Sequence, residues 1–307
     1  MMPAPTPANT VSRAVLFMTA STLMFGTMAA VIRLASEQLH PFEIAFFRNF
    51  FGFVFALPLL LRHGPSLFKT TKLPLYLLRC AIGMFGMLAG FWAIVNLPLA
   101  QAIALSYSTP LFVTIGAVLV LNEVVRARRW TAVLIGFLGV IVIVRPGGDG
   151  FSAASLVAVF GAVMSASTAI SIKFLSRTEK PDAIVLLTTL IWVPMSLLPA
   201  WFVWETPRGI IWLWIVLAGF FGTAGHMLWT RALKLADASL LTPISFLQVL
   251  VVSVYGYALF GEVLDRWIVV GAGIIFASNI YIAQRESQLA RRAVTDPDIS
   301  GDSQSPR

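Results

Sequence analysis

The sequence predicts an all-α integral membrane protein, with ten transmembrane helices arranged as two inverted five-helix repeats. Three observations lead to this prediction: the composition, ten long apolar stretches and a pattern that occurs twice. Of the 307 residues, 58% are hydrophobic and only 12% are charged, about half the charged share of a soluble domain. A water-soluble surface needs more charge than this to stay dispersed. The mean hydropathy of +0.85 agrees.

Ten apolar stretches follow one another, each near the roughly 20 helical residues that cross a bilayer core about 30 Å thick. Breaks such as His40-Pro41 and Pro146-Gly147 separate them. None has the alternating pattern of a membrane β-barrel. The run after Arg13 exceeds a signal-peptide core, so we expect it to remain as the first helix. The predicted helices span 14–36, 42–61, 74–95, 99–121, 130–145, 153–174, 183–204, 210–231, 239–260 and 266–284, and the polar residues 286–307 are predicted to form a disordered cytoplasmic tail.

Lysine and arginine predict the orientation. With the N-terminus inside, 17 of the 22 basic residues fall on the inner side and four on the outer side. Cytoplasmic loops are enriched in these residues, so both termini are predicted to be cytoplasmic, in a bacterial inner membrane. The same bias explains the net charge of +8, and no basic face interleaved with aromatics suggests nucleic acid. The single Cys80 excludes an internal disulfide.

An internal repeat is visible in two stretches, FWAIVNLPLAQAIALSYSTPLFVTIGAVLVLNE and LWTRALKLADASLLTPISFLQVLVVSVYGYALFGE. The numbers of Glu123 and Glu262 differ by 139, whereas those of Trp92 and Trp229 differ by 137, so we expect a register slip of two. Five helices per repeat is an odd number, which turns the second repeat upside down. Inverted repeats recur in secondary transporters, where one half rocks against the other. The predicted domains are 14–145 and 153–284.

These stretches, with FFRNFFGFVFALPLLLR and the closing LDRWIVVGAGIIFASNIYIAQRE, resemble the EamA-type ten-helix carriers of the drug/metabolite transporter superfamily. The resemblance covers nearly all of residues 14–284, although Asn122-Glu123 replaces the usual Gly-Glu. It implies a secondary transporter that moves a small organic metabolite by alternating access. Carriers of this kind move amino acids, nucleosides, riboflavin, S-adenosylmethionine and other solutes, so the substrate stays open.

Arg48 is the leading candidate for a substrate contact, because charges within a bilayer are costly and usually functional. It could attract an anionic group, or it could pair with Glu43 or cap carbonyls near the outer interface. Pro110 leaves the Ser106 carbonyl without its helical donor. The hydroxyls beside this break suit a pocket, or they repair the break by bonding to the backbone.

His226 and Trp229 share one helical face, and Gln248 lies near the middle of its helix. Each could contact a substrate, or bridge helices and anchor at the interface. Arg33 and Arg79 lie near helix ends, so we expect them to be structural, with long side chains that reach the membrane–water interface. The predicted substrate-binding residues are Arg48, Trp92, Tyr107, Thr109, His226, Trp229 and Gln248, and the predicted gating or structural residues are Pro110, Glu123 and Glu262.

Missing motifs narrow the function further. No phosphate-binding loop, H-E-x-x-H motif or paired intramembrane Asp occurs, so we predict neither a pump nor an enzyme, and neither a metal nor a cofactor. The expected partners are a small-molecule metabolite and the lipid bilayer, and a monomer is sufficient. The alternatives are a flippase for a lipid-linked headgroup, which needs a side opening, and a lipid-modifying membrane enzyme.

Overall fold

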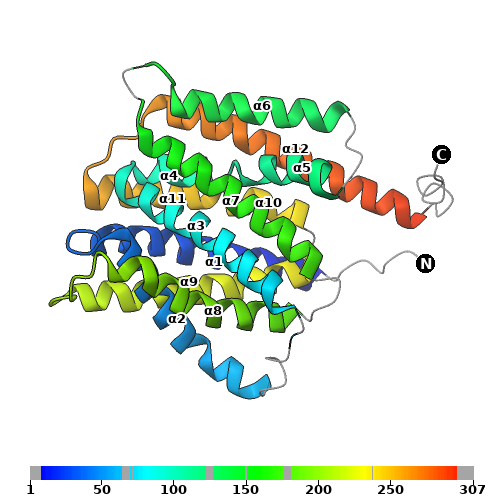
Figure 1. Ribbon diagram of the computed structural model, residues 1–307. Helices are drawn as coiled ribbons and strands as arrows, with labels where there is room; N and C mark the ends of the chain where they lie inside the picture. Colours follow the sequence, from blue (N-terminus) through cyan, green and yellow to red (C-terminus); the bar gives the residue numbers. More distant parts are fainter. Residues whose placement is uncertain are drawn as a thin grey trace.

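The computed structural model describes residues 8–63, 70, 72–121, 127–148, 151–175, 181–236 and 238–295, which form only helices and their connections (Figure 1). A helix satisfies its own backbone hydrogen bonds, as a lipid environment requires. The helices are α1 (Ala8–Ala35), α2 (Pro41–His63), α3 (Leu73–Asn96), α4 (Leu99–Ser106), α5 (Thr109–Leu121), α6 (Ala127–Val144), α7 (Ala153–Leu175), α8 (Pro181–Trp201), α9 (Ile211–Leu235), α10 (Ala238–Ser245), α11 (Leu247–Phe260) and α12 (Arg266–Thr295).

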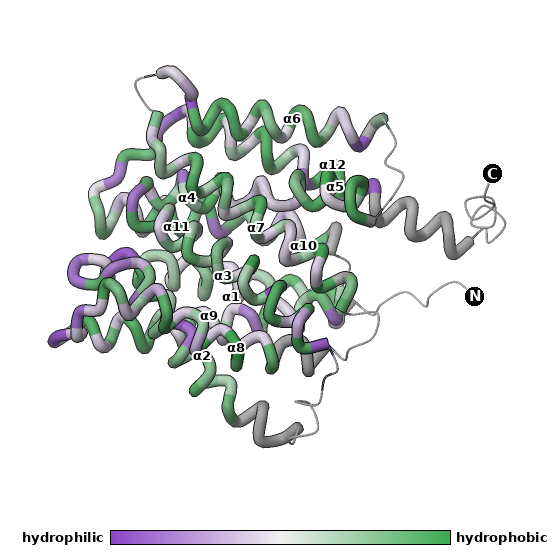
Figure 2. The backbone as a smooth tube through the Cα atoms, viewed as in Figure 1, coloured by the Kyte–Doolittle hydropathy of each residue, from purple (hydrophilic) through white to green (hydrophobic). Residues whose placement is uncertain are grey.

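The helices make ten membrane segments, because α4 with α5 and α10 with α11 each form one broken segment. Within the described chain, seven segments are long and apolar enough to cross a membrane, and shorter apolar helices add to them. Apolar residues run along the helices while hydrophilic ones gather toward their ends (Figure 2). Helix α1 begins and α12 ends on the same side of the bundle (Figure 1). We call this the terminal side, and the other the opposite side.

Helix packing obeys a pseudo-two-fold relation between the halves. Helix α1 packs on α9, and its counterpart α7 packs on α3. Likewise α1 contacts α11 and α7 contacts α5, while α2 pairs with α8 and α6 with α12. When the first five segments are exchanged for the last five, the α1 contacts become the α7 contacts, and the α2–α8 and α6–α12 pairs map onto themselves. The predicted fold of two inverted five-helix repeats is confirmed.

A constant offset relates the two halves from α3 onward. Helices α4 and α10 each have eight residues and begin at Leu99 and Ala238, which are 139 apart. The extended residues that cap α3 and α9, Leu97 and Ala236, are also 139 apart. Helix ends therefore match without the predicted slip of two residues, and that part of the prediction is wrong.

Close contacts give the same register. The Ser21 hydroxyl of α1 donates to the Gly225 carbonyl of α9 at 2.8 Å. In the other half, a Cβ on Gly161 of α7 would lie 3.4 Å from the Gly86 carbonyl of α3. Gly86 and Gly225 are again 139 apart, and Ser21 and Gly161 are 140 apart. These offsets identify equivalent residues throughout both halves.

The two tryptophans are therefore not equivalent, contrary to the prediction. With an offset of 139, the counterpart of Trp229 is Gly90, and the counterpart of Trp92 is Arg231. The chemical identity of the two side chains suggested a match, whereas helix ends and backbone contacts define the register.

Helix α12 is longer than predicted. It continues to Thr295, well into the region predicted as a disordered tail, while 296–307 lie outside the described residues. Glu, Gln, Leu, Ala and Arg between 286 and 293 all favour helix. Neither Gly nor Pro occurs before Pro297 in this stretch, so no residue there ends the helix.

Two polar links join the halves at the connections on the opposite side. Gln38, after α1, donates to the Thr206 carbonyl at 3.0 Å and accepts from the Arg208 amide at 3.1 Å, between α8 and α9. Arg145, at the end of α6, forms an ion pair with Asp265, just before α12.

The hydrogen bond from Arg145 lowers the pKa of Asp265 below its ordinary value. The pair therefore stabilises the fold above the unfolded-state pKa of about 3.9, and this contribution is lost as pH falls through the lower folded-state pKa. We expect Asp265→Asn to reduce the dependence of unfolding temperature on pH in the acidic range. The effect should stay below about 1 kcal/mol, because the pair is partly exposed. Thermal unfolding in detergent across the acidic pH range tests this, and identical pH profiles would contradict it.

Candidate functional site

The two broken segments meet at their breaks. Tyr107 lies between α4 and α5, and Phe246 lies between α10 and α11. Their numbers differ by 139, so they are equivalent positions of the two halves. Their rings stack with centroids 4.1 Å apart and an interplanar angle of 23°. Two equivalent residues in direct contact mark the pseudo-two-fold axis, so the breaks lie at the interface of the halves.

Local chemistry accounts for the first break. Pro110 lies in the first turn of α5, where no backbone donor is needed. The Thr109 hydroxyl donates to the Ser106 carbonyl at 2.7 Å, and the Ser108 hydroxyl donates to the Leu105 carbonyl at 2.7 Å. Hydroxyls thus supply the donors that Pro110 and the break remove, which was one of the two interpretations left open by the sequence. Thr109 nevertheless also lines a hollow described below.

A polar network surrounds the stacked rings. The Tyr107 hydroxyl donates to the Ser245 carbonyl and lies 3.2 Å from Gln248 Oε1. Asn279 of α12 donates to the Tyr107 carbonyl at 2.8 Å. The structure therefore brings two predicted site residues, Tyr107 and Gln248, together from opposite halves. Asn279 was missed, although an amide within an apolar helix is a usable signal in the sequence.

Tyr107→Phe should keep the ring stack and remove the hydroxyl that joins the halves. The Ser245 carbonyl and the Gln248 amide would each lose a partner, at about 1–3 kcal/mol for a buried group left unsatisfied. We expect reduced transport with the protein still folded in the membrane. Ser253→Ala is a matched control, because it removes a hydroxyl that bonds within its own helix, to the Val249 carbonyl. Equal effects of the two variants on transport would argue against a special role for the Tyr107 contact.

Arg48 of α2 forms a second cluster with α1 and α9. Its Nη1 donates to Asn49 Oδ1 at 3.1 Å, and its buried Nε has no hydrogen-bond partner. It lies against Gly222, where a Cβ would come within 2.9 Å of Nε. Both Glu43 carboxylate oxygens lack a hydrogen-bond partner, so the expected alternative of a pair with Arg48 is not what the structure contains. Among the described residues, Arg48 has no anionic partner.

His226 of α9 belongs to this second cluster. It lies one helical turn after Gly222, against which Arg48 packs, and its ring meets Phe25 of α1 edge-on, with centroids 5.0 Å apart. Helix α1 also contacts α11 of the second half, since the Thr27 hydroxyl lies 3.0 Å from the Tyr255 hydroxyl. Two predicted site residues, Arg48 and His226, thus lie together.

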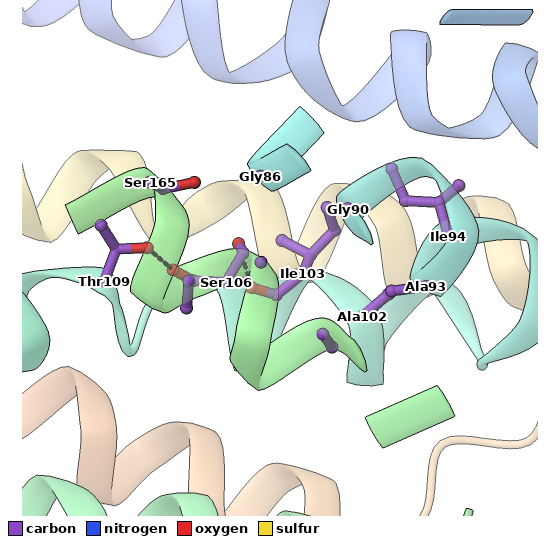
Figure 3. A pocket seen from close by; sticks show the side chains of 12 residues that line it. Gly86, Gly90, Ala93, Ile94, Ala102, Ile103, Ser106, Thr109 and Ser165 are labelled. Atoms are coloured by element: carbon purple, nitrogen blue, oxygen red, sulfur yellow. Dashed lines mark hydrogen bonds between the residues drawn. The ribbon is translucent and has the colours of Figure 1, made fainter. Parts of the chain in front are cut away.

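A hollow of about 90 Å³ lies where α3, α4, α5 and α7 meet (Figure 3). Small side chains make most of its wall, and it has an open face. We call it the small-residue hollow. Residues that line it include Gly86, Gly90, Ser106, Thr109, Ala158 and Ser165.

The remaining predicted site residues lie elsewhere. Trp92 is near the opposite side, where its ring centroid is 5.8 Å from that of His40. Trp229 is 43% exposed on the terminal-side half of α9. Glu123 lies outside the described residues. Arg79 is buried and donates to Thr188 of α8. Its side chain therefore points into the protein, whereas we expected it to reach the membrane–water interface.

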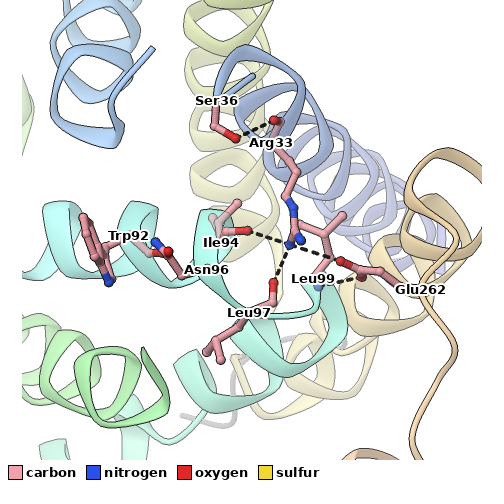
Figure 4. A network of polar contacts seen from close by, with 8 residues as sticks. All are labelled: Arg33, Ser36, Trp92, Ile94, Asn96, Leu97, Leu99 and Glu262. Atoms are coloured by element: carbon pink, nitrogen blue, oxygen red, sulfur yellow. Dashed lines mark hydrogen bonds and ion pairs between the residues drawn. The ribbon is translucent and has the colours of Figure 1, made fainter. Parts of the chain in front are cut away.

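Arg33 and Glu262 close the opposite side (Figure 4). Arg33 Nη1 lies 3.1 Å from Glu262 Oε1 and donates to the carbonyls of Ile94, at 3.0 Å, and Leu97. The other Glu262 oxygen accepts from the Leu99 amide at 2.8 Å. This network, the Arg33 cluster, ties the end of α1 and the α3–α4 connection of the first half to the α11–α12 connection of the second. Arg33 therefore contacts groups of both halves of the chain.

Comparison with known proteins identifies the family. The model of the EamA-like transporter family matches twice, over residues 12–145 and 152–284. The chain belongs to the EamA-like transporter family. A riboflavin transporter of Vibrio cholerae serotype O1 is 33% identical, over 90% of this chain and 95% of that protein. An S-adenosylmethionine uptake transporter of Rickettsia felis is 29% identical, over 83% of this chain and 87% of the relative.

Further relatives agree on class and fold. A pseudopaline exporter of Pseudomonas aeruginosa is 25% identical over 88% of this chain and 95% of its own length. A solved crystal structure matches 92% of this chain and 98% of that chain, with a TM-score of 0.59 and 22% identity, which shows a shared fold. The three sequence relatives are named as transporters or exporters, so the prediction of a transporter rather than an enzyme is confirmed. This EamA-like protein is a multi-pass membrane transporter of small metabolites.

Proposed function

We propose that this EamA-like transporter moves a small organic metabolite across a bacterial inner membrane by alternating access, as a secondary transporter with a site between its halves. The observation that carries the proposal is the meeting of two broken helices at Tyr107 and Phe246. Discontinuous helices at a repeat interface are where secondary transporters bind their substrates. The two halves, 14–145 and 153–284, would move against each other, and one chain contains both, so a monomer suffices.

The substrate contacts we propose start from Arg48. An arginine that contacts no anion among the described residues is suited to a carboxylate, phosphate or other electron-rich group of a solute. Tyr107, Gln248 and His226 add hydrogen-bonding groups from the same interface. The named relatives carry riboflavin and S-adenosylmethionine. Both solutes combine a flat nitrogen-containing ring system with a polar chain, so we take this combination as the substrate class to test first.

Differences between the two sides support alternating access. The opposite side is held by the Arg33 cluster and by the links from Gln38 and Arg145. On the terminal side, a groove of about 320 Å³ at the ends of α1 and α9 is lined by Arg13, Phe17, Arg231, Lys234 and Leu235. The positive-inside rule assigns this basic side to the cytoplasm. We therefore interpret this conformation as inward-facing, with cytoplasmic termini.

The repeat relation suggests which residues act when the other side closes. An offset of 139 relates Glu123 to Glu262, and an offset of 140 relates Arg33 to Lys173. We propose that Glu123 and Lys173 perform, at the terminal side, the role of the Arg33–Glu262 pair. The Glu123 position lies outside the described residues, so this rests on the sequence offsets alone.

A metabolite profile tests the proposed function. Solutes inside cells and in the medium would be compared between cells that overproduce the wild type and cells that overproduce Arg48→Ala at matched membrane abundance. We expect at least one solute to shift between compartments with the wild type alone. If no solute shifts in media supplemented with riboflavin and S-adenosylmethionine, the proposed substrate class is wrong.

A further inference from the structure

We infer that the small-residue hollow is the subsite for a flat ring of the transported solute, a nitrogen heterocycle with donor groups on its edge. This inference deepens the proposed function and rests on it. It starts from a difference between two places that the pseudo-two-fold axis relates, each of which is built from both halves.

Larger equivalent residues occupy the place that the pseudo-two-fold axis relates to the hollow. The counterpart of Gly90 is Trp229, that of Ser165 is Phe25, and that of Thr109 is Gln248, with offsets of 139, 140 and 139. Bulky rings and an amide thus stand at the symmetry-related place, at the positions where the hollow has a hydrogen, a hydroxymethyl and a small hydroxyl group. The hollow exists because only one of the two symmetry-related places is lined by these small residues.

Two more positions follow the same trend. Ala158 and Ala102 line the hollow, and their counterparts are Met18 and Leu241, both of which are buried in the core. Small residues at a helix contact ordinarily allow close packing. Here a Cβ placed on Gly90 would meet no atom within 4 Å. Close packing therefore does not explain Gly90, whereas room for a ligand does.

The wall chemistry fits a flat heterocycle. Ile94 and Ile103 offer apolar surface to ring faces. The hydroxyl groups of Ser106 and Thr109 donate to backbone carbonyls at 2.7 Å, which leaves their lone pairs as acceptors. Ser165 is exposed in the hollow and has no hydrogen-bond partner among the described residues. A ring with N–H or NH₂ groups on its edge would match these acceptors.

The volume of the small-residue hollow limits how a ring could bind in it. A sealed cavity of about 150 Å³ holds benzene in an engineered protein, whereas this hollow measures about 90 Å³. Because the hollow has an open face, a ring would enter edge-first and extend outward rather than be enclosed. The rest of a solute would then remain outside the hollow.

Protection of a cysteine tests the inference without measuring transport. The natural chain contains one cysteine, Cys80, which is buried, so labelling of Ser165→Cys by N-ethylmaleimide has a low background. The probes are lumichrome and adenine, flat heterocycles, and ribitol, which has no ring. We expect lumichrome or adenine to slow labelling of Ser165→Cys at least fivefold, and ribitol to leave it unchanged. Gly273→Cys on α12, another glycine with no atom within 4 Å of a Cβ, should label at the same rate with every probe.

A substitution that fills the hollow provides a second test of the inference. In the Ser165→Cys background, Gly90→Leu should abolish protection, while the matched Gly273→Leu should preserve it. If Ser165→Cys does not fold, Gly90→Cys reports on the same space. The inference is overturned if neither heterocycle protects the cysteine, if ribitol protects equally, or if Gly90→Leu retains protection. Protection without solute movement in the metabolite profile would instead count against the proposed function and leave the ring site standing.

Discussion

Arg48→Met should lower transport at least tenfold and leave the protein as stable as the wild type, or more so. The guanidinium has no anionic partner among the described residues, and its Nε is buried without a hydrogen bond. A charge-assisted hydrogen bond to a solute contributes about 1.5–3 kcal/mol, which corresponds to roughly ten- to a hundredfold in binding. Removing a buried charge that has no anionic partner should offset the loss of its hydrogen bond to Asn49.

Measuring stability together with transport shows whether Arg48 binds the solute or holds the fold. Transport rates and unfolding temperatures would be measured side by side for Arg48→Met and for Arg208→Met, an exposed arginine in the α8–α9 connection. The control should match the wild type in both. A marked loss of stability in Arg48→Met would show that Arg48 holds the fold, and unchanged transport would remove it from the site.

Breaking the Arg33 cluster should have the second large effect. In Arg33→Gln, the Glu262 carboxylate loses its ion-pair partner and the Ile94 and Leu97 carbonyls lose a charged donor. Side-chain exposures of 22% for Arg33 and 15% for Glu262 mean that solvent compensates only in part. We expect the closed opposite side to open, with transport at least fivefold slower. A double-mutant cycle of Arg33→Gln with Glu262→Gln should give a coupling of about 1–3 kcal/mol.

A second ion pair on the same side provides the comparison. Arg145 and Asp265 also join the halves, but their side chains are more exposed, at 26% and 36%. The corresponding cycle of Arg145→Gln with Asp265→Asn should give a coupling below about 1 kcal/mol. Labelling of an introduced cysteine from the opposite side should increase only when the Arg33 cluster is broken. If both pairs give the same coupling and the same labelling, the closure we describe is not specific to the Arg33 cluster.

Much of the fold could be predicted from hydropathy, because lipid allows few structures other than long apolar helices. The break before Pro110 was also predictable, since proline removes a donor at a known place. The second break was not predictable in the same way: Pro243 lies inside α10, and the helix breaks only at Phe246. What matches in the two halves is the position of the break rather than the proline.

The candidate site was only partly predictable. Tyr107 and Gln248 were singled out separately, but their contact depends on how the two halves face each other. Matching Trp92 with Trp229 gave an offset of 137, whereas the helix ends of the structure give 139. With the wrong offset, the equivalence of Gly90 and Trp229 could not be predicted, and neither could the small-residue hollow. Arg33 was expected to be structural and to reach the membrane–water interface because it lies near a helix end. Its contact with Glu262 could not be predicted, since Glu262 lies in the other half of the chain, near the start of the last helix.

Uptake into liposomes is the most direct test of the proposed transport site. Purified wild type, Arg48→Met and Arg208→Met would be reconstituted separately and offered labelled riboflavin and labelled S-adenosylmethionine. We predict that the wild type and Arg208→Met accumulate at least one of the two solutes, and that Arg48→Met accumulates it at least tenfold more slowly. Entry of neither solute, or equal rates for wild type and Arg48→Met, would contradict the proposed role of Arg48 in moving solutes of this class.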